Sequence, residues 1–241
     1  MSPRFHNLRL GFNRRLKKLA FGHATEDFYK EITGLIHVGA NYGQEAKAYD
    51  KLGLEVLWVE AIPEIHDSLR DVIQDFKKQK AIAALVTDVD GQEYQFNISN
   101  NNGLSSSIYE LKEHKDIWPD VHYINSLKLQ SKTLNSVLLD NNINPTDYQA
   151  LVLDTQGSEL LVLKGCLPLL QHIKYIKTEV ANFEAYEGGC QLEELNQFIT
   201  NQGFVEISRR EMAQHKQGGS YYDIIYKRIS ATYSNEVFDI D

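Results

Sequence analysis

Short apolar runs alternate with amphipathic stretches along most of this chain. Four apolar runs have the length and composition of strands and lie at 34–38, 55–60, 150–153 and 173–180. Stretches with helical spacing follow them, at 45–52, 63–76, 159–170 and 192–201. A short helix at 133–139 and two strands at 204–208 and 221–226 complete the pattern. Because strands and helices alternate, we predict an α/β fold with a doubly wound, mostly parallel sheet.

The middle of the chain departs from this alternation. Residues 80–86 form another β-like run, and the turn signal Asp90-Gly91 separates it from an alternating run at 94–98. This spacing predicts a hairpin. Residues 99–132 are rich in Asn, Ser and charged side chains, so we expect a long loop or an insertion on the substrate side.

Length and charge divide the chain into one folded domain and two short additions. The 241 residues carry a formal net charge of -8, and 42 % of them are hydrophobic, as in an ordinary globular protein. The segment 1–30 differs, because its first twenty residues hold six Lys and Arg and no acid. We predict a basic amphipathic arm that packs on the domain or on a second subunit, with contact to an anionic membrane surface as the alternative. The domain is placed at 31–229 and an acidic tail at 230–241.

Composition also excludes several classes of partner. A broadly acidic body disfavours nucleic acid, since phosphate binding needs clustered Lys and Arg. No apolar run approaches the ~18 residues that cross a bilayer. Cys166 and Cys190 are too few for a disulfide framework and lack the spacing of a zinc motif. We expect a cytoplasmic protein that binds a small molecule and can form oligomers.

A glycine turn with a later acid indicates the kind of ligand. Gly39 and Gly43 follow the first apolar run, and Glu60 lies 21 residues after Gly39, near the spacing at which an acid meets ribose hydroxyls. The alternative for Glu60 is a solvent-exposed acid at a strand end. The turn lacks the G-x-G-x-x-G fingerprint of dinucleotide folds, which points to a ligand without a pyrophosphate. S-adenosylmethionine has ribose and adenine with an amino-acid tail, and it meets that description.

Several blocks of sequence, in order, resemble one known family. They are 37–43, 60–63, 88–91, 103–108, 153–159 with 163–165, and 175–180. Together they are similar to the FkbM family of S-adenosylmethionine-dependent methyltransferases over residues 33–228. The resemblance implies a class I, Rossmann-like methyltransferase sheet of seven strands, with the last strand antiparallel. Residues 31–229 would then be the methyltransferase domain.

The resemblance also implies the cofactor contacts. Gly39, Asn41 and Gly43 would line the methionine end of S-adenosylmethionine, Glu60 the ribose and Asp88 the adenine. His37 stands where many family members carry an Asp that helps to hold the cofactor's ammonium group. We place His37 on the cofactor side, with a hydrogen-bonded strand residue as the alternative.

Two carboxylates at strand ends are the candidates for chemistry. Asp154 and Glu179 each end a predicted strand, beside the expected position of the transferred methyl group. Either carboxylate can take the proton of a hydroxyl acceptor, or the two can hold a divalent cation. Ser106, Ser107 and Tyr186 are candidates for contact with the acceptor, although serine clusters in loops also form turns.

The sequence therefore predicts an S-adenosylmethionine-dependent O-methyltransferase. Its acceptor would be the hydroxyl of a sugar, a glycan or a natural product. Two alternatives are a nicotinamide-dependent oxidoreductase, which the altered glycine pattern disfavours, and a non-catalytic cofactor-binding or scaffold module on the same fold.

Overall fold

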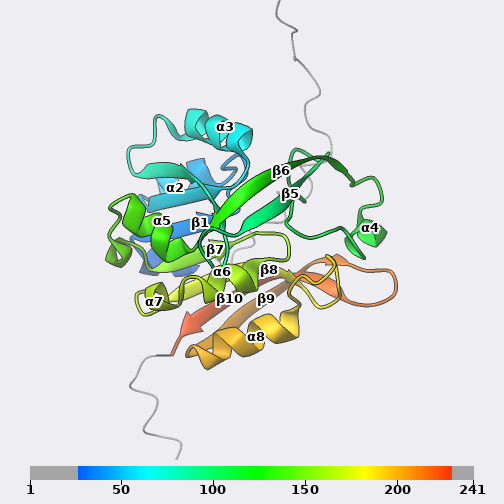
Figure 1. Cartoon of the computed structure of the whole chain (residues 1–241). Helices are drawn as coiled ribbons and strands as arrows, with labels where there is room; N and C mark the ends of the chain where they lie inside the picture. Colours follow the sequence, from blue (N-terminus) through cyan, green and yellow to red (C-terminus); the bar gives the residue numbers. More distant parts are fainter. Residues whose placement is uncertain (1–26, 230–241) are drawn as a thin grey trace, which may run out of the picture.

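A seven-stranded sheet forms the centre of the computed structural model, which describes residues 27–229 (Figure 1). Its strand order is β3-β2-β1-β7-β8-β10-β9. The bounds in that order are Gln79–Ala83, Glu55–Glu60, Gly34–Val38, Ala150–Leu153, Tyr175–Ala181, Ser220–Arg228 and Phe204–Gln214. Strand β10 runs antiparallel to both of its neighbours, β8 and β9, and the other pairs of this sheet are parallel. The predicted seven-stranded, mostly parallel sheet with an antiparallel last strand is confirmed.

Helices cover both faces of this sheet, as a doubly wound fold requires. One face packs against α5, α6, α7 and α8, which span Leu134–Asp140, Glu159–Lys164, Leu167–Leu170 and Leu192–Asn201. The other face packs against η1, α2 and α3, which span Asp27–Glu31, Ala46–Lys51 and Pro63–Ile73. Strand β2 illustrates the two cores, because Leu57 and Val59 enter the first and Val56 and Trp58 enter the second.

A second, three-stranded sheet replaces the predicted hairpin. It has the order β4-β6-β5, with bounds Leu85–Val86, Tyr123–Lys132 and Glu93–Ser99. Strand β5 pairs antiparallel with β6, whereas β4 runs parallel to β6, so the hairpin across Asp90-Gly91 is wrong. Asp90 has another task, because its carboxylate accepts hydrogen bonds from Thr133 N and Ser136 Oγ and so fixes the start of α5.

The predicted long loop is also partly wrong. Residues 99–132 contain α4, at His114–Ile117, and the ten-residue strand β6. Most side chains of β6 are exposed or half-buried, so its sequence lacks the apolar alternation by which strands are recognised. The same cause explains β9, which extends six residues beyond the predicted end at 208 along an exposed edge of the large sheet. Figure 1 shows β5 and β6 side by side as a ribbon next to the large sheet.

Two further boundaries differ for reasons of packing. The run at 80–86 divides at Ala84, since β3 joins the large sheet and β4 the small one. The helix predicted at 159–170 divides at Gly165, where a Cβ atom would lie 2.1 Å from the carbonyl oxygen of Thr87. Of the predicted arm and tail, residues 1–26 and 230–241 lie outside the described residues. No helix within 27–229 is long and apolar enough to cross a membrane.

Candidate functional site

The turn after β1 depends on backbone that only small or permissive residues adopt. Gly39, Asn41 and Gly43 have positive φ angles of 80°, 46° and 63°. A Cβ atom at Gly39 would lie 1.9 Å from the carbonyl oxygen of Asp154. Glycine at 39 therefore lets the ends of β1 and β7 approach each other, and this contact sets the floor of the site.

Glu60 holds that turn from the neighbouring strand. One carboxylate oxygen accepts a hydrogen bond from Asn41 N at 2.7 Å, and the other accepts from Ile62 N at 2.9 Å. The side chain is buried, and burial raises the pKa of Glu60, while the backbone hydrogen bonds act against this rise. Each oxygen retains a lone pair that can accept from a ligand.

A cavity opens where the ends of β1, β2 and β7 meet. Its empty space, open solvent included, is about 570 Å³. Gly39, Asn41 and Glu60 line it on one side, Asp154 and Gln156 on another, and loop residue Ser106 closes it. The position follows the rule for open α/β sheets, in which ligands bind beyond the carboxyl ends of parallel strands.

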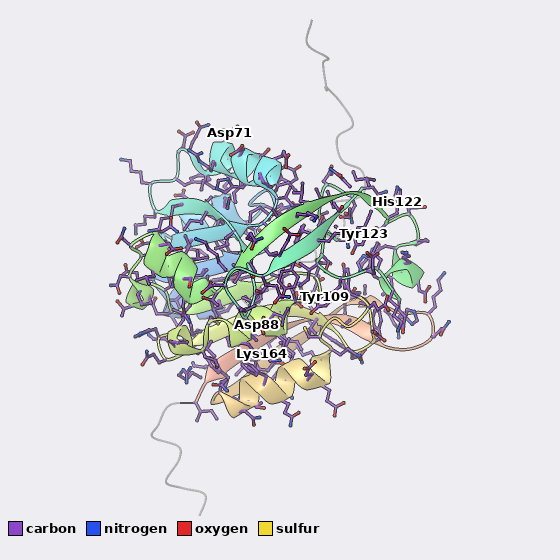
Figure 2. The ribbon with its side chains drawn as sticks, in the orientation of Figure 1. Asp71, Asp88, Tyr109, His122, Tyr123 and Lys164 are labelled. Atoms are coloured by element: carbon purple, nitrogen blue, oxygen red, sulfur yellow. The ribbon has the colours of Figure 1, made fainter. Side chains whose placement is uncertain are left out.

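Three predicted cofactor residues do not line this cavity. Gly43 instead packs against Leu69, because a Cβ atom built on Gly43 would lie 2.5 Å from Leu69 Cδ1. Asp88 is exposed and lies beside the end of α6. Its Cα atom is 3.1 Å from the position of a Cβ atom built on Gly165. Figure 2 labels Asp88 and Lys164 in this region. The third residue is His37, which lies within β1.

His37 belongs to the core on the face of α2 and α3. Its ring stacks on Trp58 with centroids 5.0 Å apart, and Nδ1 is buried without a hydrogen-bond partner among the described residues. Burial, with a smaller contribution from the charge of Lys177, lowers the pKa of His37 to about 3. A neutral, stacked ring in this place supports the β1–β2 core and does not reach the cavity.

Asp154 directly follows β7, and Glu179 lies next to it within the neighbouring strand β8, two residues before that strand ends. The pKa of Glu179 is raised by burial first and by the charge of Asp154 next. The pKa of Asp154 is also raised, by partial desolvation first and by the negative charges of Glu159 and Asp223, while the hydrogen bond from Gln156 acts against the rise. Asp154 is exposed at the cavity rim, so its desolvation is weaker than that of Glu179. Asp223 pairs with Arg210, so its own charge is compensated. The two candidate carboxylates therefore bind protons more strongly than free acids do.

A second pocket adjoins the first. Its empty space, open solvent included, is about 300 Å³, and Glu179, Tyr186 and Tyr221 are among the residues that line it. Gln156 lines both spaces. The Gln156 side chain bridges them, because Nε2 donates to Asp154 Oδ1 at 2.5 Å while Oε1 accepts from the Tyr186 hydroxyl at 2.6 Å. We call the first space the cofactor cavity and the second the acceptor pocket, after the ligands that the sequence predicts for them.

Of the three predicted acceptor residues, Tyr186 lines the acceptor pocket, whereas Ser106 and Ser107 do not. Ser107 Oγ donates to the carbonyl oxygen of Gln156 at 2.7 Å and is fully buried. Ser106 lines the cofactor cavity, and its Oγ accepts from Ser99 N at 3.0 Å. Tyr186 lines the acceptor pocket with its hydroxyl on Gln156. Both serines therefore have loop-holding bonds, the alternative recognised from the sequence.

Glu159 is structural. Its carboxylate accepts from Thr155 N at 2.8 Å and from Gly157 N at 3.0 Å, and Cys190 Sγ donates to it at 3.3 Å. These bonds close the loop between β7 and α6 and fix Gln156, which has a φ angle of 53°. Sequence reasoning overlooked Gln156, although a polar residue before a glycine after a strand end is typical of such a turn.

The side chains of the described part of the chain form no metal site. Within residues 27–229, no group of three or more His, Cys, Asp and Glu side chains is placed to hold a metal ion. Asp154 and Glu179 remain a pair whose other neighbours are the charged residues Asp223, Lys177 and Glu159.

Known proteins agree with this arrangement. The model of the methyltransferase FkbM domain matches residues 37–206. The 2-O-methyltransferase NoeI of Sinorhizobium fredii (strain NBRC 101917 / NGR234) is 23 % identical over 166 residues, which cover 66 % of this chain and 67 % of that protein.

Solved structures share the fold at low identity. An uncharacterized protein from Listeria monocytogenes serotype 4b is 10 % identical with a TM-score of 0.50, over 92 % of this chain and 69 % of that one. The METTL16 MTase domain is also 10 % identical with a TM-score of 0.50, over 91 % and 67 % of the two chains. The family model covers most of the chain, and the sheet order and the cavity agree with it. This chain belongs to the FkbM family of S-adenosylmethionine-dependent methyltransferases.

Proposed function

We propose that the protein transfers the methyl group of S-adenosylmethionine to a hydroxyl of a sugar, a glycan or a natural product. The observation that carries this proposal is the pair of proton-binding carboxylates, Asp154 and Glu179, between the cofactor cavity and the acceptor pocket. The similarity to NoeI, a 2-O-methyltransferase, supports oxygen as the methylated atom. We place the transferase domain at 31–229.

Cofactor binding follows from the features of the first cavity. Bound S-adenosylmethionine supplies a sulfonium methyl group for in-line displacement. Glu60 accepts from the ribose hydroxyls with its remaining lone pairs, and the turn at Gly39 allows the amino-acid end to approach the backbone closely. Leu85 and Val86 offer an apolar wall for the adenine, in place of the exposed Asp88.

Proton removal is the task of the carboxylates. As the acceptor oxygen forms its bond to the methyl group and the sulfur–methyl bond breaks, the hydroxyl proton passes to Asp154 or Glu179. A base must be deprotonated to act. Since burial raises both pKa values, transfer falls as the pH decreases through a range above that of a free carboxylic acid.

Substitution of each carboxylate tests the proposal. We expect Asp154→Asn and Glu179→Gln to lower kcat by about 10²- to 10⁴-fold, the usual share of general acid–base catalysis, with little change in the Kd of S-adenosylmethionine. The assay is transfer of labelled methyl from S-adenosylmethionine to a panel of methyl glycosides and disaccharides. Asp71→Asn is the matched control, because Asp71 is exposed on α3 away from the cavity (Figure 2).

Three other results would speak against parts of the proposal. Wild-type rates in both variants would exclude the carboxylates as bases. A protein that binds S-adenosylmethionine but methylates nothing in the panel would fit the non-catalytic module. Loss of transfer on addition of a chelator, restored by a divalent cation, would show that the carboxylates hold a metal.

A further inference from the structure

A buried hydrogen-bond relay connects the loop above the cofactor cavity with the acceptor pocket. Ser105 Oγ lies 3.0 Å from His114 Nε2, and His114 Nδ1 lies 2.7 Å from the Tyr221 hydroxyl oxygen. All three side chains are buried, at 5 %, 3 % and 4 % exposure. Trp118 covers the imidazole with its ring centroid 4.6 Å away. Each polar atom of the relay is therefore largely shielded from water and needs a hydrogen-bond partner in the protein or in the adjoining pocket.

The imidazole in this relay is neutral at physiological pH. Burial lowers the pKa of His114 to about 4, and no carboxylate hydrogen-bonds to it within the described residues. In a neutral imidazole one ring nitrogen donates and the other accepts. If the donor is known for one of the two hydrogen bonds of His114, the donor of the other bond follows.

Asn101 decides that direction. Its Oδ1 accepts from Ser105 N at 3.3 Å and from Ser99 Oγ at 2.6 Å, and a backbone N–H can only donate, so the amide orientation is fixed. Nδ2 of Asn101 then donates to Ser105 Oγ at 2.9 Å. Ser105 Oγ could also accept from His114 Nε2, but its hydroxyl hydrogen would then have no acceptor among the described residues, whereas the hydrogen of Tyr221 can be directed to the acceptor pocket that Tyr221 lines. His114 consequently carries its proton on Nδ1.

The position of the His114 proton determines whether the Tyr221 hydroxyl can donate a hydrogen bond to the pocket. Because His114 Nδ1–H donates to the phenol oxygen, the hydroxyl hydrogen of Tyr221 is not used by His114. The bond with His114 is the one that this hydroxyl makes within residues 27–229, and Tyr221 lines the acceptor pocket beside Glu179. We infer that the pocket offers the O–H donor of Tyr221 together with the carboxylate acceptor of Glu179.

We propose that Tyr221 is a specificity-determining residue that donates a hydrogen bond to a neutral oxygen of the acceptor. The inference rests on the proposed function, since it takes this pocket as the acceptor site. A hydroxyl group both accepts from Tyr221 and donates to a carboxylate, whereas a protonated amine has no lone pair for the phenol. Ser105 and His114 act as positioning residues, because they keep Tyr221 in its donating state.

The substitution Asn101→Asp reverses the relay without changing side-chain size. A carboxylate at 101 accepts from Ser105, so Ser105 accepts from His114 Nε2 and His114 Nδ1 accepts from Tyr221. The phenol then donates to His114 and not to the pocket. Imidazole ¹⁵N resonances distinguish the two tautomers in histidine-labelled protein, and His114→Gln assigns the signals among the eight histidines. Asn102→Asp is the control, because it adds the same charge at an exposed neighbouring position.

We expect the Nδ1–H tautomer in the wild-type and Asn102→Asp proteins and the Nε2–H tautomer in Asn101→Asp. An Nε2–H tautomer in the wild-type protein overturns the inference, whether or not Asn101→Asp folds, because Tyr221 must then donate to His114. An unchanged tautomer in folded Asn101→Asp protein overturns it as well.

Kinetics separate this inference from the proposed function. With the methyl glycoside that the wild-type protein methylates fastest, Tyr221→Phe and Asn101→Asp should each lower kcat/KM about tenfold, with the Kd of S-adenosylmethionine unchanged. An unchanged kcat/KM in Tyr221→Phe removes the donor role while the methyltransferase function stands. If no glycoside is methylated although His114 has the Nδ1–H tautomer, the proposed function fails and the donating state of Tyr221 is supported.

Discussion

The cofactor cavity and the acceptor pocket meet at Gln156, yet they are built in different ways. The cofactor side is made by backbone, with glycines at positive φ and a Glu60 carboxylate that reaches only 19 residues back to Asn41 N. The acceptor side is made by side chains from distant segments, since His114 and Tyr221 are 107 residues apart in the sequence. A backbone-built site leaves a local signature in the sequence, and a pocket built from distant side chains does not.

The largest effect should come from a single methyl group on the cofactor side. We expect Gly39→Ala to lower the free energy of unfolding by at least about 3 kcal/mol, because its Cβ would lie 1.9 Å from the Asp154 carbonyl and its φ is 80°. Gly53→Ala is the matched control, since φ is 70° there but no atom lies within 4 Å of a Cβ. The Gly53→Ala substitution should lower the free energy of unfolding by about 1 kcal/mol.

Urea unfolding of both variants measures this difference. Equal losses of unfolding free energy in the two variants would mean that the ends of β1 and β7 can move apart at little cost. The cofactor side would then be no more rigid than an ordinary turn. A Gly39→Ala protein that folds should also bind S-adenosylmethionine more weakly, because the shifted strand end moves Asp154.

The same contrast explains how much could be predicted from the sequence. The parallel strands could be located because both of their faces are buried, which gives continuous apolar runs such as 34–38. Gly39 and Glu60 could be placed because a turn and an acid one βα unit later belong to one local unit. Strand β6 could not be located from the sequence, since its side chains are largely exposed. The pairing of β4 with β6 could not be predicted either.

The contacts on the acceptor side have no signal in a single sequence. His114 is one of eight histidines in the sequence, and nothing near it in the chain indicates Tyr221 or Ser105 as partners. Asp154 and Glu179 could be paired because the ends of neighbouring parallel strands lie side by side. The bridge through Gln156 depends on a loop conformation with a φ of 53°, which is uncommon for a residue other than glycine.

A second prediction concerns His37, which lies beneath the cofactor side but outside its cavity. Its pKa in the folded protein is lowered by burial to about 3, whereas in the unfolded chain it is near 6.5. Between these values the unfolded chain binds a proton that the folded protein does not, so stability is lost as the pH falls below about 6.5. From pH 7 to pH 5 this single group should cost about 2 kcal/mol.

The variant His37→Phe isolates that contribution, because it keeps a ring on Trp58 and removes the titrating group. Its free energy of unfolding should fall less than that of the wild-type protein between pH 7 and pH 5, by about 2 kcal/mol. The Kd of S-adenosylmethionine at pH 7 should be unchanged. Weaker cofactor binding would show that His37 does act on the cofactor side, as predicted from the sequence.

The smallest effect should come from the acceptor side, where several side-chain bonds share the task of holding Gln156. Tyr186→Phe removes the hydroxyl that donates to Gln156 Oε1, while Asp154 still accepts from Nε2 and Ser107 still holds the carbonyl. We expect a loss of about 1 kcal/mol in transition-state stabilisation, about fivefold in kcat/KM, with cofactor affinity unchanged.

A double-mutant cycle decides whether Tyr186 acts through Gln156 or touches the acceptor itself. If its hydroxyl only positions Gln156, then Tyr186→Phe should have no further effect in a Gln156→Asn background, where the shortened amide no longer reaches both partners. Additive losses would instead mean that the hydroxyl contacts the acceptor. In that case the acceptor pocket would depend less on the loop after β7. The backbone turn at Gly39 would then be the main feature that distinguishes the cofactor cavity from the acceptor pocket.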